Sequence, residues 1–166
     1  MAIRILALLA LGSLLGACED KEKGYYQHLS SINSSIQEGS VEKIDNTVGT
    51  FSNYVEKNKL YDEKSFLSKD GISETVSFMN CVEDYKKVLE RKVKQESELL
   101  RWNTNLKEVK NPLTLRSLPE PEKAFASIEQ KIEATNLKIQ EIDVELRELK
   151  ILCDSNYSKL VSLYNR

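Results

Sequence analysis

Histidine, proline and glycine are scarce in this chain, which narrows the chemistry it can carry. Its 166 residues include one histidine, three prolines, six glycines and three cysteines. Metal sites commonly need several His, Cys, Asp or Glu ligands at set spacings, and thiol–disulfide oxidoreductases usually carry a Cys-x-x-Cys motif; the sequence contains neither pattern. No glycine-rich loop could cradle a phosphate, and His28 is expected at the boundary of an apolar stripe rather than as a base. We therefore expect no enzyme, no metal and no cofactor.

Neither sign of charge dominates the chain. Twenty-four Lys and Arg face 26 Asp and Glu, a net charge of −2, and basic residues are interleaved with acidic ones. Nucleic-acid-binding domains usually show clustered Lys and Arg on one face. Pairs such as Glu83 with Lys87 instead have the spacing of solvated helix faces. We therefore expect neither nucleic acid nor acidic lipid as a binding partner.

The chain begins with an apolar segment too short to span a bilayer. Arg4 precedes an apolar run from Ile5 to Leu15 in which Ser13 is the sole polar residue. A membrane-spanning helix needs about 20 apolar residues, so residues 1–17 are interpreted as a secretory signal. The segment ends in Leu15-Gly16-Ala17-Cys18, which resembles the lipobox of bacterial lipoproteins.

This resemblance covers Met1 to Cys18 and implies how the chain is anchored. It implies cleavage before Cys18, a diacylglyceryl thioether on that cysteine, and usually another acyl chain on the new amino terminus. Several acyl chains, at about 0.8 kcal/mol per buried methylene, hold a protein stably on a membrane. Residues 18–24 are then the lipidated cysteine and a charged tether, and residues 25–166 are the folded domain. The alternatives are a buried cysteine in an ordinary N-terminal helix and a signal cut elsewhere that releases a soluble protein.

The residues after Cys18 bear on which membrane holds the anchor. In Gram-negative bacteria of the enteric kind, an aspartate directly after the lipidated cysteine tends to retain a lipoprotein in the inner membrane. This chain has Glu19 there, and Asp20 follows. Both membranes stay open, and the departure favours the outer one, with the domain in the periplasm.

Two heptad patterns predict an all-α fold dominated by a long antiparallel coiled-coil hairpin. Twelve positions from Phe125 to Leu163 follow alternating steps of three and four, the spacing of a coiled-coil seam. Thr135, Cys153 and Asn156 occupy three of them, and the other nine carry large apolar residues: Phe125, Ile128, Ile132, Ile139, Ile142, Leu146, Leu149, Leu160 and Leu163. An upstream seam includes Phe78, Cys81, Tyr85, Val88, Leu99, Trp102, Leu106, Val109 and Leu113. We expect helices over about 73–111, with Ser73 as N-cap, and 121–164, with Pro121 in the first turn.

One antiparallel register aligns both seams. The connection from Asn111 to Glu120 carries prolines and is expected to be too short for another element, so the helices should fold back on each other. Apolar layers then match, as in Phe125 with Val109, Ile128 with Leu106, Ile132 with Trp102, Leu146 with Val88, Leu149 with Tyr85, and Cys153 with Cys81. Opposed cysteines in an oxidising compartment predict a disulfide between Cys81 and Cys153; two reduced core cysteines are the alternative.

The middle of this register is polar. Lys92 faces Ile142, and Gln95 faces Ile139. Snorkelling of the polar side chains at the seam edge is favoured. A further helix meeting them, or a register-setting role for Lys92, is the alternative.

Two shorter amphipathic patterns precede the hairpin. Their apolar residues have helical spacing at Tyr25, Leu29, Ile32 and Ile36, and then at Val41, Ile44, Val48, Phe51 and Val55. Gly39-Ser40 should break and cap them. The flanks of the hairpin are available to cover both stripes, which predicts a three- or four-helix bundle. Residues 61–71 are expected to form a polar connection, with at most one helical turn around 64–67.

The hairpin turn offers a candidate contact point. Leu115, Arg116 and Leu118 lie there, and the interpretations are self-packing, with Leu118 stapling the second helix, or binding of a partner protein. We expect a membrane-anchored envelope lipoprotein that acts on an unidentified envelope protein as an adaptor, assembly factor or structural spacer. Alternatives are an inhibitory, immunity or exclusion lipoprotein that blocks a toxin, phage or conjugation component, and a carrier of an apolar ligand lined by Trp102, Tyr85 and Phe51. A heptad seam can pair within one chain or between chains, so the oligomeric state stays open.

Overall fold

The computed structural model describes residues 21–62 and 67–163, and over these residues the chain is all-α. One helix covers residues 21–38, here called the N-terminal helix, and the others are α2 (Val41–Asn58), α3 (Lys69–Val109), α4 (Pro112–Ser117) and α5 (Pro121–Ser162). No strand occurs in these ranges. The all-α fold with two short N-terminal helices and a long helix pair is confirmed.

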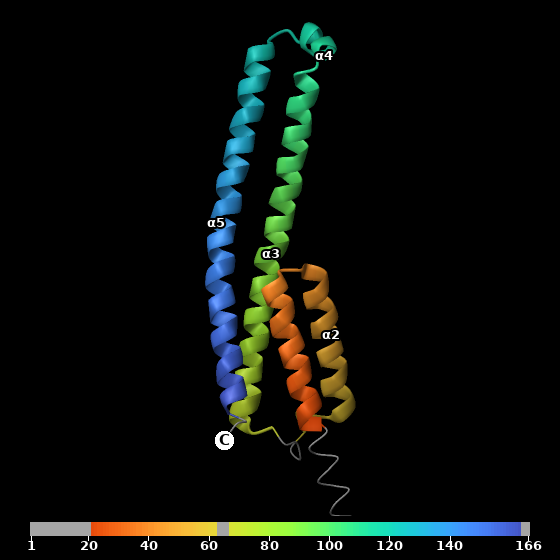
Figure 1. Ribbon diagram of the computed structural model, residues 1–166, viewed down its shortest axis with the longest axis vertical. Coiled ribbons are helices and arrows are strands. Elements are labelled where there is room, and N and C mark those ends of the chain that lie inside the picture. The colour runs from red at the N-terminus through yellow and green to blue at the C-terminus, as the bar shows by residue number, and fades with distance from the viewer. Residues whose placement is uncertain (1–20, 63–66, 164–166) are drawn as a thin grey trace, which may run out of the picture. The chain divides into compact units, whose positions relative to one another are not determined.

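The chain forms two compact units, and α3 and α5 contribute to both. The hairpin unit is Asp84–Leu149. The four-helix unit comprises the other described residues: the N-terminal helix, α2, the start of α3 and the end of α5 (Figure 1).

The N-terminal helix contacts all three other helices of the four-helix unit. The Tyr54 hydroxyl of α2 donates to the Lys21 carbonyl at 2.7 Å. The Tyr25 hydroxyl is hydrogen-bonded to Thr75 of α3, and the Gln37 amide donates to Asp154 of α5 at 2.7 Å. The bundle predicted from the apolar stripes is therefore organised around the first described helix.

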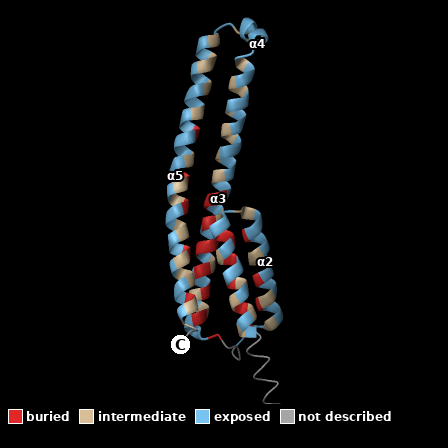
Figure 2. Ribbon diagram, viewed as in Figure 1, coloured by how far each residue is buried: buried red, intermediate tan, exposed pale blue. Residues whose placement is uncertain are grey.

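The core of this unit is built on the predicted stripe. Its members Tyr25, Leu29, Ile32 and Ile36 are all 0% exposed. The other helices of this unit also bury apolar residues, among them Ile44, Phe51, Phe78, Val82, Cys153 and Leu160; Figure 2 shows buried positions on these helices. Full burial of such a side chain contributes about 1.5–3 kcal/mol, so the helices are held chiefly by apolar packing.

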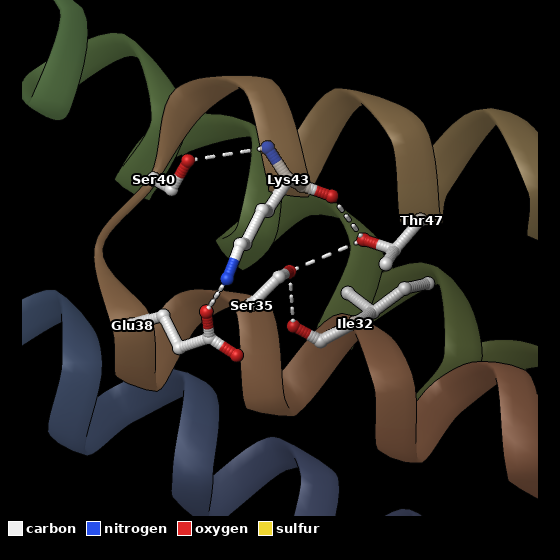
Figure 3. A network of polar contacts seen from close by, with 6 residues as sticks. All are labelled: Ile32, Ser35, Glu38, Ser40, Lys43 and Thr47. Atoms are coloured by element: carbon white, nitrogen blue, oxygen red, sulfur yellow. Dashed lines mark hydrogen bonds and ion pairs between the residues drawn. The ribbon is translucent and has the colours of Figure 1, made fainter.

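The break between the N-terminal helix and α2 is confirmed at Gly39-Ser40. Gly39 has φ 65°, a left-handed conformation that glycine adopts without the penalty of a Cβ atom. The Ser40 hydroxyl caps α2 by accepting from the Lys43 amide at 3.3 Å. Beside this turn the hydroxyls of Ser35 and Thr47 are hydrogen-bonded at 3.1 Å, which links the two helices (Figure 3).

Residues 21–24, which were predicted to belong to a tether, are helical. Gly24 packs against Tyr54 of α2 so closely that a Cβ atom added there would collide with the phenol. The glycine therefore permits a close helix contact and does not end a flexible segment.

The start of α3 also differs from the prediction. α3 begins at Lys69, and Ser73, expected as its N-cap, lies inside the helix. The hydroxyl of Ser68 accepts from the Gly71 amide at 3.0 Å instead. The expected helical turn around residues 64–67 falls mostly on residues 63–66, outside the described part of the chain.

The hairpin connection contains a short helix that was not predicted. α3 ends at Val109, and α4 (Pro112–Ser117) follows with Pro112 at its first position and Asn111 as N-cap. The Asn111 side chain accepts from the Leu113 amide at 3.1 Å. The prediction that this connection is too short for another element is wrong, because six residues form a capped helix.

The register predicted for α3 and α5 agrees with their contacts in each unit. In the hairpin unit Arg91 binds Glu145 at 2.6 Å and Lys92 binds Asp143 at 2.9 Å, while the Lys131 ammonium lies 4.4 Å from the centroid of the Trp102 ring. In the four-helix unit Cys81 pairs with Cys153. Each contact lies within two positions of the predicted pairing, so the two seams meet within one chain.

Burial in the hairpin unit is thinner than in the four-helix unit. Tyr85, Val88, Leu89, Thr135, Ile142 and Leu146 are buried. The seam residues between these and the turn, such as Leu99, Trp102, Leu106, Ile128 and Ile132, are only partly covered. A pair of helices cannot cover all sides of the seam between them, so its edges stay open to solvent. The ion pairs of Arg91 and Lys92 with α5 lie at these edges.

Candidate protein-binding surface

Of the three cysteines, Cys81 and Cys153 lie in the described part of the chain. Cys18, the predicted lipidation site, lies outside the described residues and stays a prediction. Cys81 and Cys153 form a disulfide with Cα atoms 5.5 Å apart, within the usual range for such bridges. They are 5% and 0% exposed, so the link lies inside the four-helix unit and ties α3 to α5.

The α4 turn presents apolar side chains to solvent. None of its residues is buried; Leu113 is 79% and Leu115 36% exposed. Arg116 is exposed and Leu118 half-buried, so the structure brings the three predicted partner-binding residues onto one short segment. Leu113, which was assigned to the seam, is the most exposed of the leucines, because α3 ends four residues before it.

The backbone of this turn is nonetheless fixed by hydrogen bonds. The Leu115 amide donates to the Asn111 carbonyl at 2.9 Å, and the Leu118 amide donates to the Leu115 carbonyl at 3.4 Å. Asn111 also caps the helix through its side chain. The leucines are thus carried on an ordered element.

The turn is locally basic. Residues 109–119 contain Lys110 and Arg116 and no carboxylate. Neither cation has an ion pair within the described residues, whereas Glu120, just beyond, is bound by Lys123 at 2.8 Å. Sequence reasoning had named Arg116 and missed Lys110, although the acid-free stretch was visible in the sequence.

In the polar layer formed by Lys92 and Gln95, the Lys92 side chain reaches the edge of the seam. Its side chain is 27% exposed and bridges the helices, 2.9 Å from Asp143 and 3.7 Å from Glu96. The hydrogen bond with Asp143 is the main cause that raises the pKa of Lys92, partial burial opposes it, and the charges of Asp143 and Glu96 add to the rise. The side chain of Gln95 has no such polar contact at its oxygen, because Oε1 is buried without a hydrogen-bond partner.

A shallow groove of about 350 Å³ lies beside this layer in the hairpin unit. Its lining is Arg91, Lys94, Gln95, Lys138, Glu141 and Ile142. Arg91 is already held by Glu145, and the remaining charges are of both signs. The groove therefore has no feature that selects a ligand.

The remaining residues considered for chemistry are engaged in packing. His28 is half-buried, with its ring centroid 4.6 Å from that of Tyr54. Phe51 lies in the four-helix core, 5.5 Å from the Tyr25 ring. In the hairpin unit Tyr85 is buried, which raises its pKa, and Trp102 has the cations of Arg101 and Lys131 against its ring.

The described residues contain neither a metal-binding cluster nor a membrane-spanning helix. Within residues 21–62 and 67–163, no three His, Cys, Asp or Glu side chains are grouped so that they could hold a metal ion. In the same ranges no helix has the length and apolar character needed to cross a membrane.

Comparisons with protein-family models, curated proteins and solved structures found no match to this chain.

Proposed function

We propose that this protein is a non-enzymatic envelope lipoprotein, anchored through lipid on Cys18, that acts by binding another envelope protein as an adaptor, assembly factor or spacer. The binding role is proposed from the exposure of α4. It is a capped helix with no buried residue, and Leu113 at 79% exposure contributes little to the fold of this chain. Exposed apolar side chains on an ordered element are typical of interaction sites.

The anchor supports this role by concentrating the domain at a membrane. The first described helix already includes Lys21, and only two residues separate Lys21 from Cys18. At roughly 3.5 Å per residue, lipid on Cys18 holds the start of the four-helix unit within about 10 Å of the bilayer. Tethering of this kind raises the effective concentration of a binding surface toward partners on the same membrane.

The lipid is tested by mass spectrometry of the amino-terminal peptide from the native envelope. The proposal predicts an acylated Cys18 and no trace of residues 1–17. An unmodified Cys18, or a mature chain that starts elsewhere, would refute the anchor.

The binding role is tested with Leu115→Ser and Leu118→Ser, which should abolish capture of a cross-linked envelope partner while leaving helicity unchanged. The matched control is Leu137→Ser, because Leu137 is 55% exposed in the same unit but lies outside the turn. Capture that survives the turn substitutions would contradict the role assigned to these residues.

A further inference from the structure

The α4 turn, residues 110–118, has an ordered backbone, but its apolar side chains are not covered by the rest of the chain. Fixing the backbone of one residue costs about 1–2 kcal/mol in entropy, yet no residue of α4 is buried. Capping by Asn111 and the bond from the Leu115 amide to the Asn111 carbonyl hold the helix. The backbone of Leu113 is therefore held in place, while its side chain is 79% exposed.

Cations flank this leucine on both sides. Lys110 and Arg116 each lie three residues from Leu113, and both are exposed and without an ion pair among the described residues. Leu113 and Arg116 are spaced to share one face of α4. The surface is thus an apolar centre with a basic edge.

We propose that the α4 turn inserts Leu113 into an apolar pocket of a partner protein whose rim carries carboxylates that meet Lys110 and Arg116. This inference rests on the protein-binding role proposed above and specifies the partner's chemistry. A well-packed apolar anchor surrounded by polar contacts is the usual energetic centre of a protein interface. Charges at the rim of an interface raise the association rate and the specificity for the partner.

The charge pattern favours a pocket over an anionic membrane surface. The segments that flank the acid-free turn carry three carboxylates, Glu108, Glu120 and Glu122, against two cations, Lys107 and Lys123, so they are not basic. A flat anionic surface pressed against the turn would come close to these carboxylates as well as to Lys110 and Arg116. A pocket that admits only residues 110–118 meets the leucines of the turn with Lys110 and Arg116, and no carboxylate.

The test uses the full chain in living cells, with a photo-cross-linking residue at exposed Ser117. Leu113→Ser should lower the yield of the protein adduct by about 30-fold, as expected for a central apolar anchor. The double reversal Lys110→Glu with Arg116→Glu should lower it on the order of tenfold. In isolated envelopes, the wild-type yield should also fall as salt rises, because rim charges are screened.

Matched controls come from the same unit. Leu137→Ser removes a leucine that is 55% exposed, and Lys94→Glu with Lys138→Glu reverses two exposed cations that have no ion pair among the described residues. Both should leave the adduct unchanged, with circular dichroism confirming that all variants stay folded. Adducts with phospholipid, equal losses in the controls, or a yield indifferent to the Lys110 and Arg116 reversal would overturn the inference.

One outcome separates this inference from the broader proposal. If a probe at Leu137 captures a protein while the probe at Ser117 captures none, the chain binds a partner through the flank of the hairpin. The protein-binding role then stands, and the pocket for Leu113 is wrong.

Discussion

Breaking the link between Cys81 and Cys153 should lower the free energy of unfolding substantially. The two residues are 72 positions apart, and closing a loop of that length removes chain entropy worth about 4.4 kcal/mol from the unfolded state on the loop-entropy estimate. With a urea dependence of about 2 kcal/mol per molar, the unfolding midpoint should fall by about 2 M. The loss arises because reduction frees the unfolded chain while the apolar contacts of the four-helix unit remain.

The assay is urea unfolding followed by circular dichroism, on protein reduced while unfolded and then refolded with reductant. Reduction must precede refolding, since Cys153 is fully buried. The double variant Cys81→Ala with Cys153→Ala is the control, because it separates loss of the link from loss of sulfur packing and should not respond to reductant. Identical midpoints for oxidised and reduced wild type, or two free thiols in protein isolated from its native source, would refute the reasoning.

Three further predictions concern individual side chains. Gln95→Leu should stabilise the hairpin unit by about 1–2 kcal/mol in urea unfolding, since it replaces a buried, unpartnered Oε1 with an apolar group; a destabilised variant would contradict the assigned environment. In Gly24→Ala the collision with Tyr54 costs about 1–3 kcal/mol, and the helix propensity of alanine offsets up to about 1 kcal/mol of this cost. The control Gly49→Ala, which meets nothing within 4 Å, has the gain alone and should be the more stable variant by about 1–3 kcal/mol. Folding raises the pKa of Lys92, so its ammonium group adds to the free energy of unfolding. This contribution is complete below the pKa of the unfolded chain, about 10.4, and is lost as pH rises through the pKa of the folded state. Lys92→Met should therefore reduce the loss of stability at alkaline pH, and an unchanged pH profile would rule out this contribution.

The heptad spacing was sufficient to predict the long helix pair and its register. Coiled-coil seams repeat along a helix, so the pattern that positions Val88 against Leu146 also positions Cys81 opposite Cys153. The break at Gly39-Ser40 was equally local, because a left-handed glycine and a capping hydroxyl are properties of two adjacent residues. Such features depend on short-range geometry and are legible in one sequence.

The features that were predicted wrongly are one contact between distant segments and two helix boundaries. Gly24 looked like the end of a tether, but its role is to admit the ring of Tyr54 from another helix. Gly71 and Ser73 looked like a helix start, yet α3 begins earlier and Gly71 is buried within it. The seam assignment of Leu113 failed because continuing the heptad across Asn111-Pro112 ignored where α3 ends.

The most direct test of the hairpin is the distance between spin labels at Lys94→Cys and Glu141→Cys. Both residues are exposed and line the same groove between α3 and α5, and paired helices lie about 8–10 Å apart. In the chain with Cys18→Ser and the native disulfide intact, the account predicts strong dipolar broadening that persists when labelled protein is diluted tenfold with unlabelled protein. Broadening that is absent, or that disappears on dilution because the labels belong to different chains, would contradict it.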